Sequence, residues 1–284
     1  MIAPLACPVR GCGLLLECRG RHYVCTRGHS HDVGRSGYIN LLQPQDRRSR
    51  AAGDSAEVVR ARAAILEAGV GRAQHRAVVD LAVRVLKPHE QPVVVDLGSG
   101  TGDVLIALAA TDTVCAVGID LSAAAADYAA RLSKVPLWVV ANADRRLPLL
   151  DGCIDLIVSV HGRRNPEECW RVLAPDAHLI VAIPAADDLI ELREAVQGRG
   201  LERTREVDLL AEYAARFAVR EQFSIRERLT LSADTLRDIL RATYRGGRTS
   251  GSARIQALDT LAVTIASDIV LLQRQSYAVG SAPP

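Results

Sequence analysis

From residue 92 onward, the chain alternates short and almost uninterrupted apolar segments with segments of helical spacing. The apolar segments are expected to be strands, at residues 93–98, 114–120, 137–141, 155–160 and 178–184. Helices are expected between them, at residues 102–110, 122–133, 166–173 and 187–198. Strands that are apolar on both faces and alternate with helices form a parallel sheet covered on both sides. The pattern therefore predicts an α/β domain and excludes all-helical and all-β folds.

The segments on either side of this alternation complete the expected domain. Two amphipathic helices precede it, at residues 56–68 and 74–86, and Asp54 or Ser55 can cap the first of them. Later segments are expected to be strands at residues 221–232 and 261–274, with a helix at 233–243 between them. These late strands can add an antiparallel edge, so we expect a mostly parallel sheet of seven strands.

A glycine-rich loop joins the first predicted strand to the next helix. It reads Asp96-Leu97-Gly98-Ser99-Gly100-Thr101-Gly102. Alternating glycines let the backbone approach a ligand closely, and the N-terminus of the helix presents free N–H groups. A dinucleotide-binding loop would have the spacing GxGxxG and would hold a pyrophosphate at this point. The carboxylate of Asp96 would repel a phosphate, so we expect a ligand that carries an ammonium group.

Polar side chains also follow the second and third predicted strands. Asp120 ends the second strand, where a carboxylate can accept both hydroxyl groups of an unphosphorylated ribose. Asn142 and Asp144 follow the third strand, at the edge where an adenine would lie, and either of them can make that contact. An ordinary glycine turn with no nucleotide is the alternative interpretation.

This combination of a DxGxGxG loop and an acidic residue after the second strand resembles the class I S-adenosylmethionine-dependent methyltransferases. The resemblance implies a Rossmann-like domain with S-adenosylmethionine as its cofactor. The expected cofactor-binding residues are Asp96, Gly98, Ser99, Gly100, Thr101, Gly102, Asp120, Leu121, Asn142 and Asp144.

The chain has seven cysteines, and four of them lie within the first 25 residues. An odd number of cysteines does not indicate a disulfide framework. Two closely spaced ligand pairs, one of two cysteines and one of a cysteine and a histidine, are instead typical of structural zinc. In such a site the protein fills all four coordination positions of the metal. The predicted ligands of one zinc ion are Cys7, Cys12, Cys25 and His29. Cys18 could replace Cys7 in this set, and His31 could replace His29.

Charge is unevenly distributed, although the formal net charge of the chain is only +2. Residues 1–76 contain twelve arginines and six acidic residues, whereas the remainder is net acidic. A basic front part on an acidic body favours contact with a polyanion, although a solvated arginine-rich face would have the same composition. No apolar run is long enough to span a membrane, and the N-terminus lacks the features of a secretory signal, so we expect a cytoplasmic protein.

Four further motifs follow the predicted zinc knuckles. They are HDVGRSGYINLL at residues 31–42, RSRAAGDSAE at 48–57, HGRRNP at 161–166 and RVLAPDA at 171–177. In this order they resemble one family, the bacterial 23S ribosomal RNA guanine-N1 methyltransferases, some of which protect antibiotic producers from macrolides. The similarity extends from residue 7 to about residue 200. This chain departs from the family pattern in two places. Its first cysteine pair is separated by four residues instead of two, and His161-Gly162-Arg163 replaces an aromatic-Ala-Pro sequence.

The resemblance implies methylation of guanine N1 in a hairpin loop of 23S ribosomal RNA. Residues implied to surround the target base are His161, Arg164, Asn165 and Asp54, with His161 as a candidate proton acceptor. Residues implied to hold the RNA backbone are Arg35, Arg47, Arg48 and Arg50. Two alternatives stay open. The first is a methyltransferase that acts on another RNA base or on a small molecule, and the second is a non-catalytic RNA-binding protein.

The chain is expected to have four parts. We expect a zinc-binding, RNA-recognition module at residues 1–42, a basic linker with the first helix at 43–76, the methyltransferase domain at 77–276 and a frayed tail at 277–284. Ribosomal RNA is the expected partner, no membrane is expected, and a homodimer is compatible with this organisation.

Overall fold

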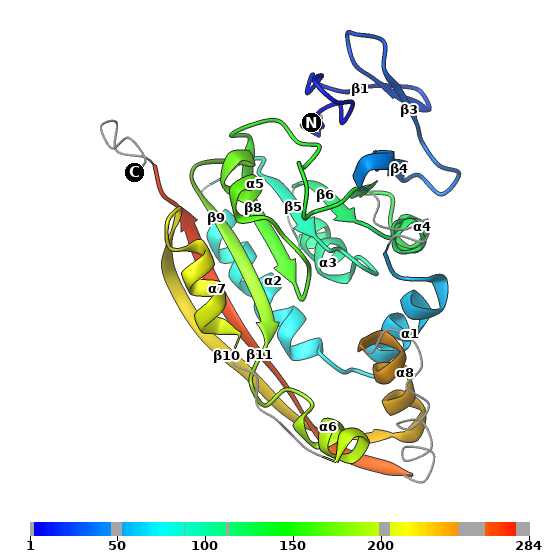
Figure 1. Cartoon of the computed structure of the whole chain (residues 1–284), viewed down its shortest axis with the longest axis vertical. Coiled ribbons are helices and arrows are strands. Elements are labelled where there is room, and N and C mark those ends of the chain that lie inside the picture. The colour runs from blue at the N-terminus through cyan, green and yellow to red at the C-terminus, as the bar shows by residue number, and fades with distance from the viewer. Residues whose placement is uncertain are drawn as a thin grey trace.

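The computed structural model describes residues 3–46, 53–87, 89–111, 114–198, 205–243 and 259–276. Its centre is an eight-stranded sheet (Figure 1) with the order β10 (Phe217–Ser232), β11 (Thr260–Arg274), β9 (Leu173–Pro184), β8 (Ile154–Val160), β5 (Val93–Leu97), β6 (Cys115–Asp120), β7 (Leu137–Val140) and β4 (Ile39–Asn40). The strands from β9 to β4 are parallel, and β11 is antiparallel to both β9 and β10. The predicted parallel sheet with an antiparallel edge is therefore confirmed.

The expected number of strands was one too small, because the N-terminal segment adds β4 to the edge of the sheet. Ile39 pairs with Val139 and Asn40 pairs with Val140, both in parallel register. Ile39 is fully buried in the core beneath this edge. A strand of two residues contains no periodicity, so only the tertiary structure identifies it.

One face of the sheet is covered by three helices, α2 (Arg72–Leu86), α3 (Asp103–Thr111) and α4 (Ala123–Leu132). Their apolar side chains form a single cluster with alternate residues of the central strands. Trp138 is buried in this cluster, and its indole N–H donates a 3.0 Å hydrogen bond to the Ser133 carbonyl. The face is therefore built as the sequence pattern predicted.

The opposite face is covered by α5 (Pro166–Val172), by α7 (Glu206–Tyr213) and by the N-terminal module. Leu5, Leu16 and Cys25 of the module belong to the same buried cluster as Val139 and Leu149 of the methyltransferase fold. The module therefore takes the place of a helix on this face. Helix α7 was not predicted, because its apolar pattern extends over only two turns.

The module contains a small antiparallel sheet of β1 (Glu17–Arg19), β2 (His22–Val24) and β3 (Ser30–Asp32). The residues just before this sheet connect it to the main domain. The N–H of Ala6 donates to the Pro148 carbonyl at 2.9 Å, and the N–H of Leu150 donates to the Pro4 carbonyl at 3.0 Å. After β4, the chain forms a short 3-10 helix at Pro44–Asp46.

The hairpin of β10 and β11 extends beyond the other strands, toward α6 (Ile190–Gln197), α8 (Ala233–Thr243) and α1 (Ala56–Glu67) (Figure 1). A third apolar cluster, which includes Leu192, Leu236 and Ile265, stabilises this region. Helix α1 begins at the predicted cap, because the Ser55 hydroxyl accepts a 3.3 Å hydrogen bond from Val58 N–H. Helices α1 and α8 lie together beside the carboxyl ends of the parallel strands. Among the described helices, none has the length and apolar character needed to cross a membrane.

Candidate functional site

A cavity of about 240 Å³ lies at the carboxyl ends of β5, β8 and β9. In open parallel sheets this edge is where ligands bind, because the strand order reverses there and leaves a crevice. Helices α1 and α8 and the start of α2 contribute the part of the lining that lies opposite the strand ends. Its polar and charged lining consists of Arg62, Gln74, His75, Asp96, Ser99, Thr101, Asp103, His161 and Asp188, together with the backbone of Gly98 and Gly100.

The glycine loop turns sharply at the end of β5 and is held by the neighbouring strand. The N–H groups of Gly98 and Ser99 donate to the Ile119 carbonyl at 2.8 and 3.2 Å. The N–H of Gly100 donates to Oδ2 of Asp120 at 2.9 Å. The loop is thus anchored to β6 and presents its remaining backbone to the cavity.

Asp96 is the buried carboxylate of this loop. Its side chain is only 4% exposed and lines the cavity, and no described residue forms a hydrogen bond or ion pair with it. Burial raises the pKa of Asp96 to about 7, and the negative charges of Asp120 and Asp103 add to this effect. A positively charged ligand would restore the ionised form. S-adenosylmethionine carries both an ammonium and a sulfonium group, so the site fits this cofactor.

Asp120 lies beside this carboxylate at the end of β6. Its Oδ1 accepts a 2.7 Å hydrogen bond from Ser122 N–H, in addition to the bond from Gly100. Burial raises its pKa, and the two N–H donors partly oppose that shift. The predicted position at the ribose end of the cofactor site is compatible with these contacts.

The segment before α1 packs directly onto the turn that follows Asp120. The Ser122 hydroxyl donates a 2.6 Å hydrogen bond to the Asp54 carbonyl, and the Asp54 carboxylate accepts one from Arg62 Nε at 3.1 Å. Gly53 has a φ of +82°, and a Cβ at this position would come within 2.5 Å of the Ser122 nitrogen. The predicted residue Asp54 therefore lies at the cofactor end of the site, and it is not among the residues that line the cavity.

The two candidates for the adenine contact, Asn142 and Asp144, form one turn after β7. The side-chain oxygen of Asn142 accepts a 3.0 Å hydrogen bond from Asp144 N–H, and Asn142 is buried. The Asp144 carboxylate forms an ion pair with Arg163 at 2.8 Å. The choice between them stays a prediction.

His161 lies on the side of the cavity away from β6. Its Nε2 atom is 3.2 Å from Gln74 Nε2 and 3.2 Å from the Ser267 hydroxyl. Burial lowers the pKa of His161 to about 4, and the neighbouring His75 lowers it further. The imidazole is therefore neutral at pH 7 and is a weak proton acceptor, which favours a positioning role.

Two other residues that the sequence placed around the target base have different contacts in the structure. Asn165 is the N-cap of α5, and its side-chain oxygen accepts hydrogen bonds from Glu167 and Glu168 N–H at 3.0 and 3.4 Å. Arg164 donates to the Gly162 carbonyl at 2.8 Å and lies over the ring of Tyr213. Neither residue is among those that line the cavity.

The cavity-lining residues that were not predicted from the sequence include Arg62, Gln74, His75 and Asp188. Arg62 could have been found from the sequence, since it belongs to the segment that resembles the methyltransferase family. Gln74 and His75 lie on an amphipathic helix, where polar side chains are usually solvated. Asp188 follows the fifth strand of the alternation, and its position depends on pairing with the distant β11.

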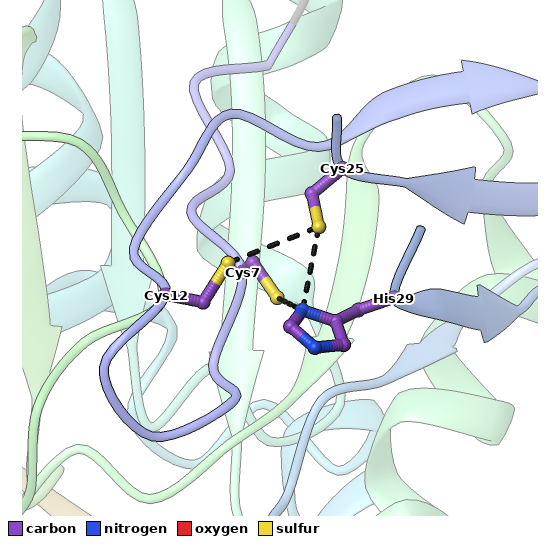
Figure 2. Close-up of side chains that lie close together, drawn as sticks. All are labelled: Cys7, Cys12, Cys25 and His29. Atoms are coloured by element: carbon purple, nitrogen blue, oxygen red, sulfur yellow. Dashed lines mark hydrogen bonds between the residues drawn. The ribbon is translucent and has the colours of Figure 1, made fainter. Parts of the chain in front are cut away.

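A second candidate site lies in the N-terminal module, where four side chains from two loops converge (Figure 2). The ligand atoms of Cys7, Cys12, Cys25 and His29 all lie within 4.8 Å of one another. Cys12 and Cys25 sulfurs are 3.8 Å apart, and His29 Nδ1 is 3.5 Å from Cys7 Sγ and 3.4 Å from Cys25 Sγ. Ligand atoms at the corners of a zinc tetrahedron are about 3.5 to 3.8 Å apart, given zinc bond lengths of about 2.0 to 2.3 Å. The donor set and its spacing fit zinc.

The structure also separates this set from the competing ligands. Cys18 is exposed on β1, and its thiol donates to the Gly20 carbonyl at 3.7 Å. His31 lies on β3 with its Nε2 atom 3.9 Å from Cys7 Sγ, which is farther than His29. The zinc-ligand assignment that agrees with this geometry therefore contains Cys7 and His29.

Of the residues expected to hold RNA, Arg35 is exposed in the turn between β3 and β4. This turn is attached to the methyltransferase fold, since the adjacent Ser36 hydroxyl donates a 2.7 Å hydrogen bond to Asp127 of α4. Arg47, Arg48 and Arg50 lie outside the described residues.

Comparison with known proteins agrees with both sites. The family model described as "Methyltransferase domain" matches residues 94–176, and a zinc-ribbon model described as "RlmA, N-terminal" matches residues 5–50. A 23S rRNA (guanine(748)-N(1))-methyltransferase of Streptomyces fradiae is 34% identical over 236 residues, which cover 82% of this chain and 81% of that protein. A putative 23S rRNA (guanine-N(1)-)-methyltransferase of Micromonospora griseorubida is 32% identical over 249 residues, which cover 82% of this chain and 83% of that protein.

Among solved structures, the crystal structure of the 4+2 cyclase SpnF is similar with a TM-score of 0.51 and 19% sequence identity. The similarity covers 73% of this chain and 82% of that protein. At this identity the likeness concerns the fold alone.

Proposed function

Because the chain belongs to the family of 23S ribosomal RNA guanine-N1 methyltransferases, we propose that it methylates N1 of a guanine in a hairpin loop of 23S ribosomal RNA. The cofactors are S-adenosylmethionine and one structural zinc ion. The observation that carries the proposal is the buried carboxylate of Asp96, which has no hydrogen-bond or ion-pair partner among the described residues, beside a cavity that continues past the cofactor loop toward β8 and β9.

When bound, S-adenosylmethionine supplies an activated methyl group on a sulfonium. The transfer is an in-line displacement, so the protein accelerates it mainly by positioning the two reactants. In our proposal Asp96 binds the cationic end of the cofactor and Asp120 binds the ribose. Gly98 and Gly100 bring the backbone close to the ligand, and the turn of Asn142 and Asp144 lies at the adenine end.

The acceptor nitrogen lies on the Watson–Crick edge of guanine, which is not accessible in a base pair. The target base is therefore expected to be unpaired or flipped out of the stack before it enters the cavity. Helices α1 and α8 cover the cavity and would exclude water from it. Arg62 joins them, because its guanidinium donates to the Ala242 carbonyl at 3.1 Å.

The zinc module is proposed to guide the RNA. Its exposed arginines, among them Arg35, would contact phosphates and set the position of the hairpin relative to the cavity. The zinc itself has no open coordination position in the set of four ligands, so its role is structural.

The test is methyl transfer from labelled S-adenosylmethionine by the full chain to 23S ribosomal RNA, followed by nucleoside mass spectrometry. We expect 1-methylguanosine as the product. Label at another base position would show a different RNA methyltransferase. Activity on small molecules without RNA would support a small-molecule methyltransferase. Binding of RNA and cofactor without methyl transfer would support a non-catalytic RNA-binding protein.

A further inference from the structure

The cofactor and the acceptor base must occupy different parts of the cavity, and the strand order indicates which part each takes. The residues proposed to hold the cofactor follow β5, β6 and β7. Strand β9 lies on the other side of β5, two strands away, which corresponds to about 10 Å at the usual spacing of strands. The side chains that follow β8 and β9 therefore face the position of the acceptor.

Asp188 is the carboxylate on that side. It lies in the loop after β9 and lines the cavity. Its Oδ1 atom accepts a 2.9 Å hydrogen bond from Ala266 N–H of β11, and no described residue forms an ion pair with it. The carboxylate is thus fixed in position by one oxygen, while the other has no described partner.

Among the other acids and bases of the lining, Asp103 and His161 have hydrogen-bond partners, and Asp96 is assigned to the cofactor. Three described carboxylates line the cavity, and two of them, Asp96 and Asp103, belong to the cofactor loop and the start of α3. Asp103 accepts a hydrogen bond from the Thr101 hydroxyl. His161 is held between Gln74 and Ser267 and is a weak proton acceptor.

We propose that Asp188 recognises the Watson–Crick edge of the target guanine and accepts the proton from its N1 atom. This inference rests on the proposed function. A carboxylate matches the adjacent N1–H and N2–H donors of guanine, one oxygen for each. Adenine carries no hydrogen on N1 and therefore offers a mismatched edge, so the same contact selects guanine.

The proton leaves before the methyl group arrives, because both occupy the same direction in the plane of the base. The N1–H bond breaks, the proton moves to the Asp188 carboxylate, and the electron pair stays on N1. That pair forms the new N1–C bond while the sulfur–methyl bond of the cofactor breaks and its electrons remain on sulfur. The positive charge of the sulfonium and the negative charge of the carboxylate are both neutralised.

The surroundings of Asp188 suit a proton acceptor near neutral pH. Burial raises its pKa to about 6, while the hydrogen bond from Ala266 opposes the shift. The charged or titratable groups around it are Arg193, Arg205 and Asp187 nearby and Arg62, His75 and His161 in the cavity lining. With this pKa the carboxylate is largely ionised at pH 7 and is more basic than an exposed aspartate.

The first test is the Asp188→Asn substitution in the full chain. Asparagine keeps an oxygen for Ala266 but cannot take the proton, so we expect kcat for 1-methylguanosine formation to fall about 100-fold or more. Cofactor affinity, measured by calorimetry, should stay within threefold of wild type. Asp187→Asn is the matched control, because Asp187 is in the same loop, pairs with Arg226 at 3.1 Å and does not line the cavity.

The pH profile separates proton transfer from a purely structural effect. In the wild type saturated with S-adenosylmethionine, kcat/KM for RNA should rise with pH as Asp188 loses its proton, with a midpoint near pH 6, and level off about one pH unit higher. Asp188→Asn should lose this limb, whereas Asp187→Asn should keep it. Wild-type kcat and an unchanged pH profile in the Asp188→Asn enzyme would overturn the proposal.

A second measurement uses the wild-type protein and does not depend on folding of a variant. Inosine in place of the target guanosine removes only the N2 amino group, so kcat/KM should fall by about 10- to 100-fold if a charged acceptor binds that group. Equal rates on both RNAs would contradict the contact. If the wild type makes no 1-methylguanosine at all, the proposed function fails, and that result is distinct from failure of the role of Asp188.

Discussion

Gly102 and Trp138 lie so close together that a Cβ atom on Gly102 would come within 2.5 Å of the indole ring. The third glycine of the cofactor loop is therefore required by packing against a buried tryptophan on β7. The loop, α3 and β7 are joined through this contact, which couples the shape of the cofactor site to the core.

Substitution of Gly102 by alanine should therefore destabilise the fold. Overpacking and the φ of +87° together should lower the free energy of unfolding by about 2 to 4 kcal/mol, measured by chemical denaturation. Gly152→Ala is the matched control, since Gly152 has a φ of +63° with nothing within 4 Å of the added Cβ. Equal losses in both variants would show that backbone strain, and not the tryptophan, is responsible.

Asp96 should make the stability of the cofactor-free protein depend on pH. Its pKa of about 7 in the folded state lies above the ordinary value of 3.8, so the folded state retains a proton that the unfolded chain has lost. Stability should therefore fall as pH rises from about 4 to 7, by on the order of 4 kcal/mol. Asp96→Asn should remove this loss and raise the Tm at pH 8.

The same variant should bind S-adenosylmethionine about 10- to 100-fold more weakly, because it loses a charged acceptor for the cationic cofactor. Calorimetry measures this affinity. Asp234→Asn, on the exposed start of α8, is the control for both readouts. Tighter binding by Asp96→Asn, or a pH dependence equal to that of the wild type, would contradict the assignment of Asp96.

Cys25→Ser should release the zinc ion, so that metal analysis falls from about one zinc per chain toward zero. Cys25 belongs to the same buried cluster as Val139, so the Tm of the whole domain should fall with it. Cys18→Ser should keep both zinc and Tm, because Cys18 is exposed on β1. Retention of zinc by the Cys25 variant would exclude it as a ligand.

Arg35→Ala should weaken RNA binding and make it less sensitive to salt. Loss of one phosphate contact reduces the slope of log K against log salt concentration by about 0.7 to 0.9. Arg220→Ala is the control, since Arg220 is exposed on β10, at the opposite edge of the sheet from β4. The same change of slope in both variants would indicate a general charge effect without a defined RNA path.

Features that depend on neighbouring residues could be predicted from the amino-acid sequence. Apolar strands and helical spacing determine the α/β fold, and the loop from Asp96 to Gly102 identifies the cofactor class. Each of these signals lies within one strand–turn–helix unit. A cap at Asp54 or Ser55 was predicted for the same reason, because capping depends only on the adjacent helix, and the structure places it at Ser55.

On the acceptor side, the contacts of the individual residues could not be read from the sequence. Asn165 follows the HGRR sequence and was expected near the target base, but its side chain caps α5. Asp188 belongs to none of the recognised motifs. Its position depends on a hydrogen bond from Ala266, which is far along the chain. A side chain that is positioned by a distant strand cannot be identified from local spacing.

The sequence alone determined the parallel sheet, the cofactor loop and the set of thiol and imidazole groups able to bind zinc. Only the tertiary structure decided that Cys7 joins Cys25 while Cys18 stays exposed, and that Ile39 extends the main sheet. The physical reason is that local backbone geometry and ligand spacing are properties of short segments. Burial and contacts between distant segments exist only when the whole chain has folded around one core.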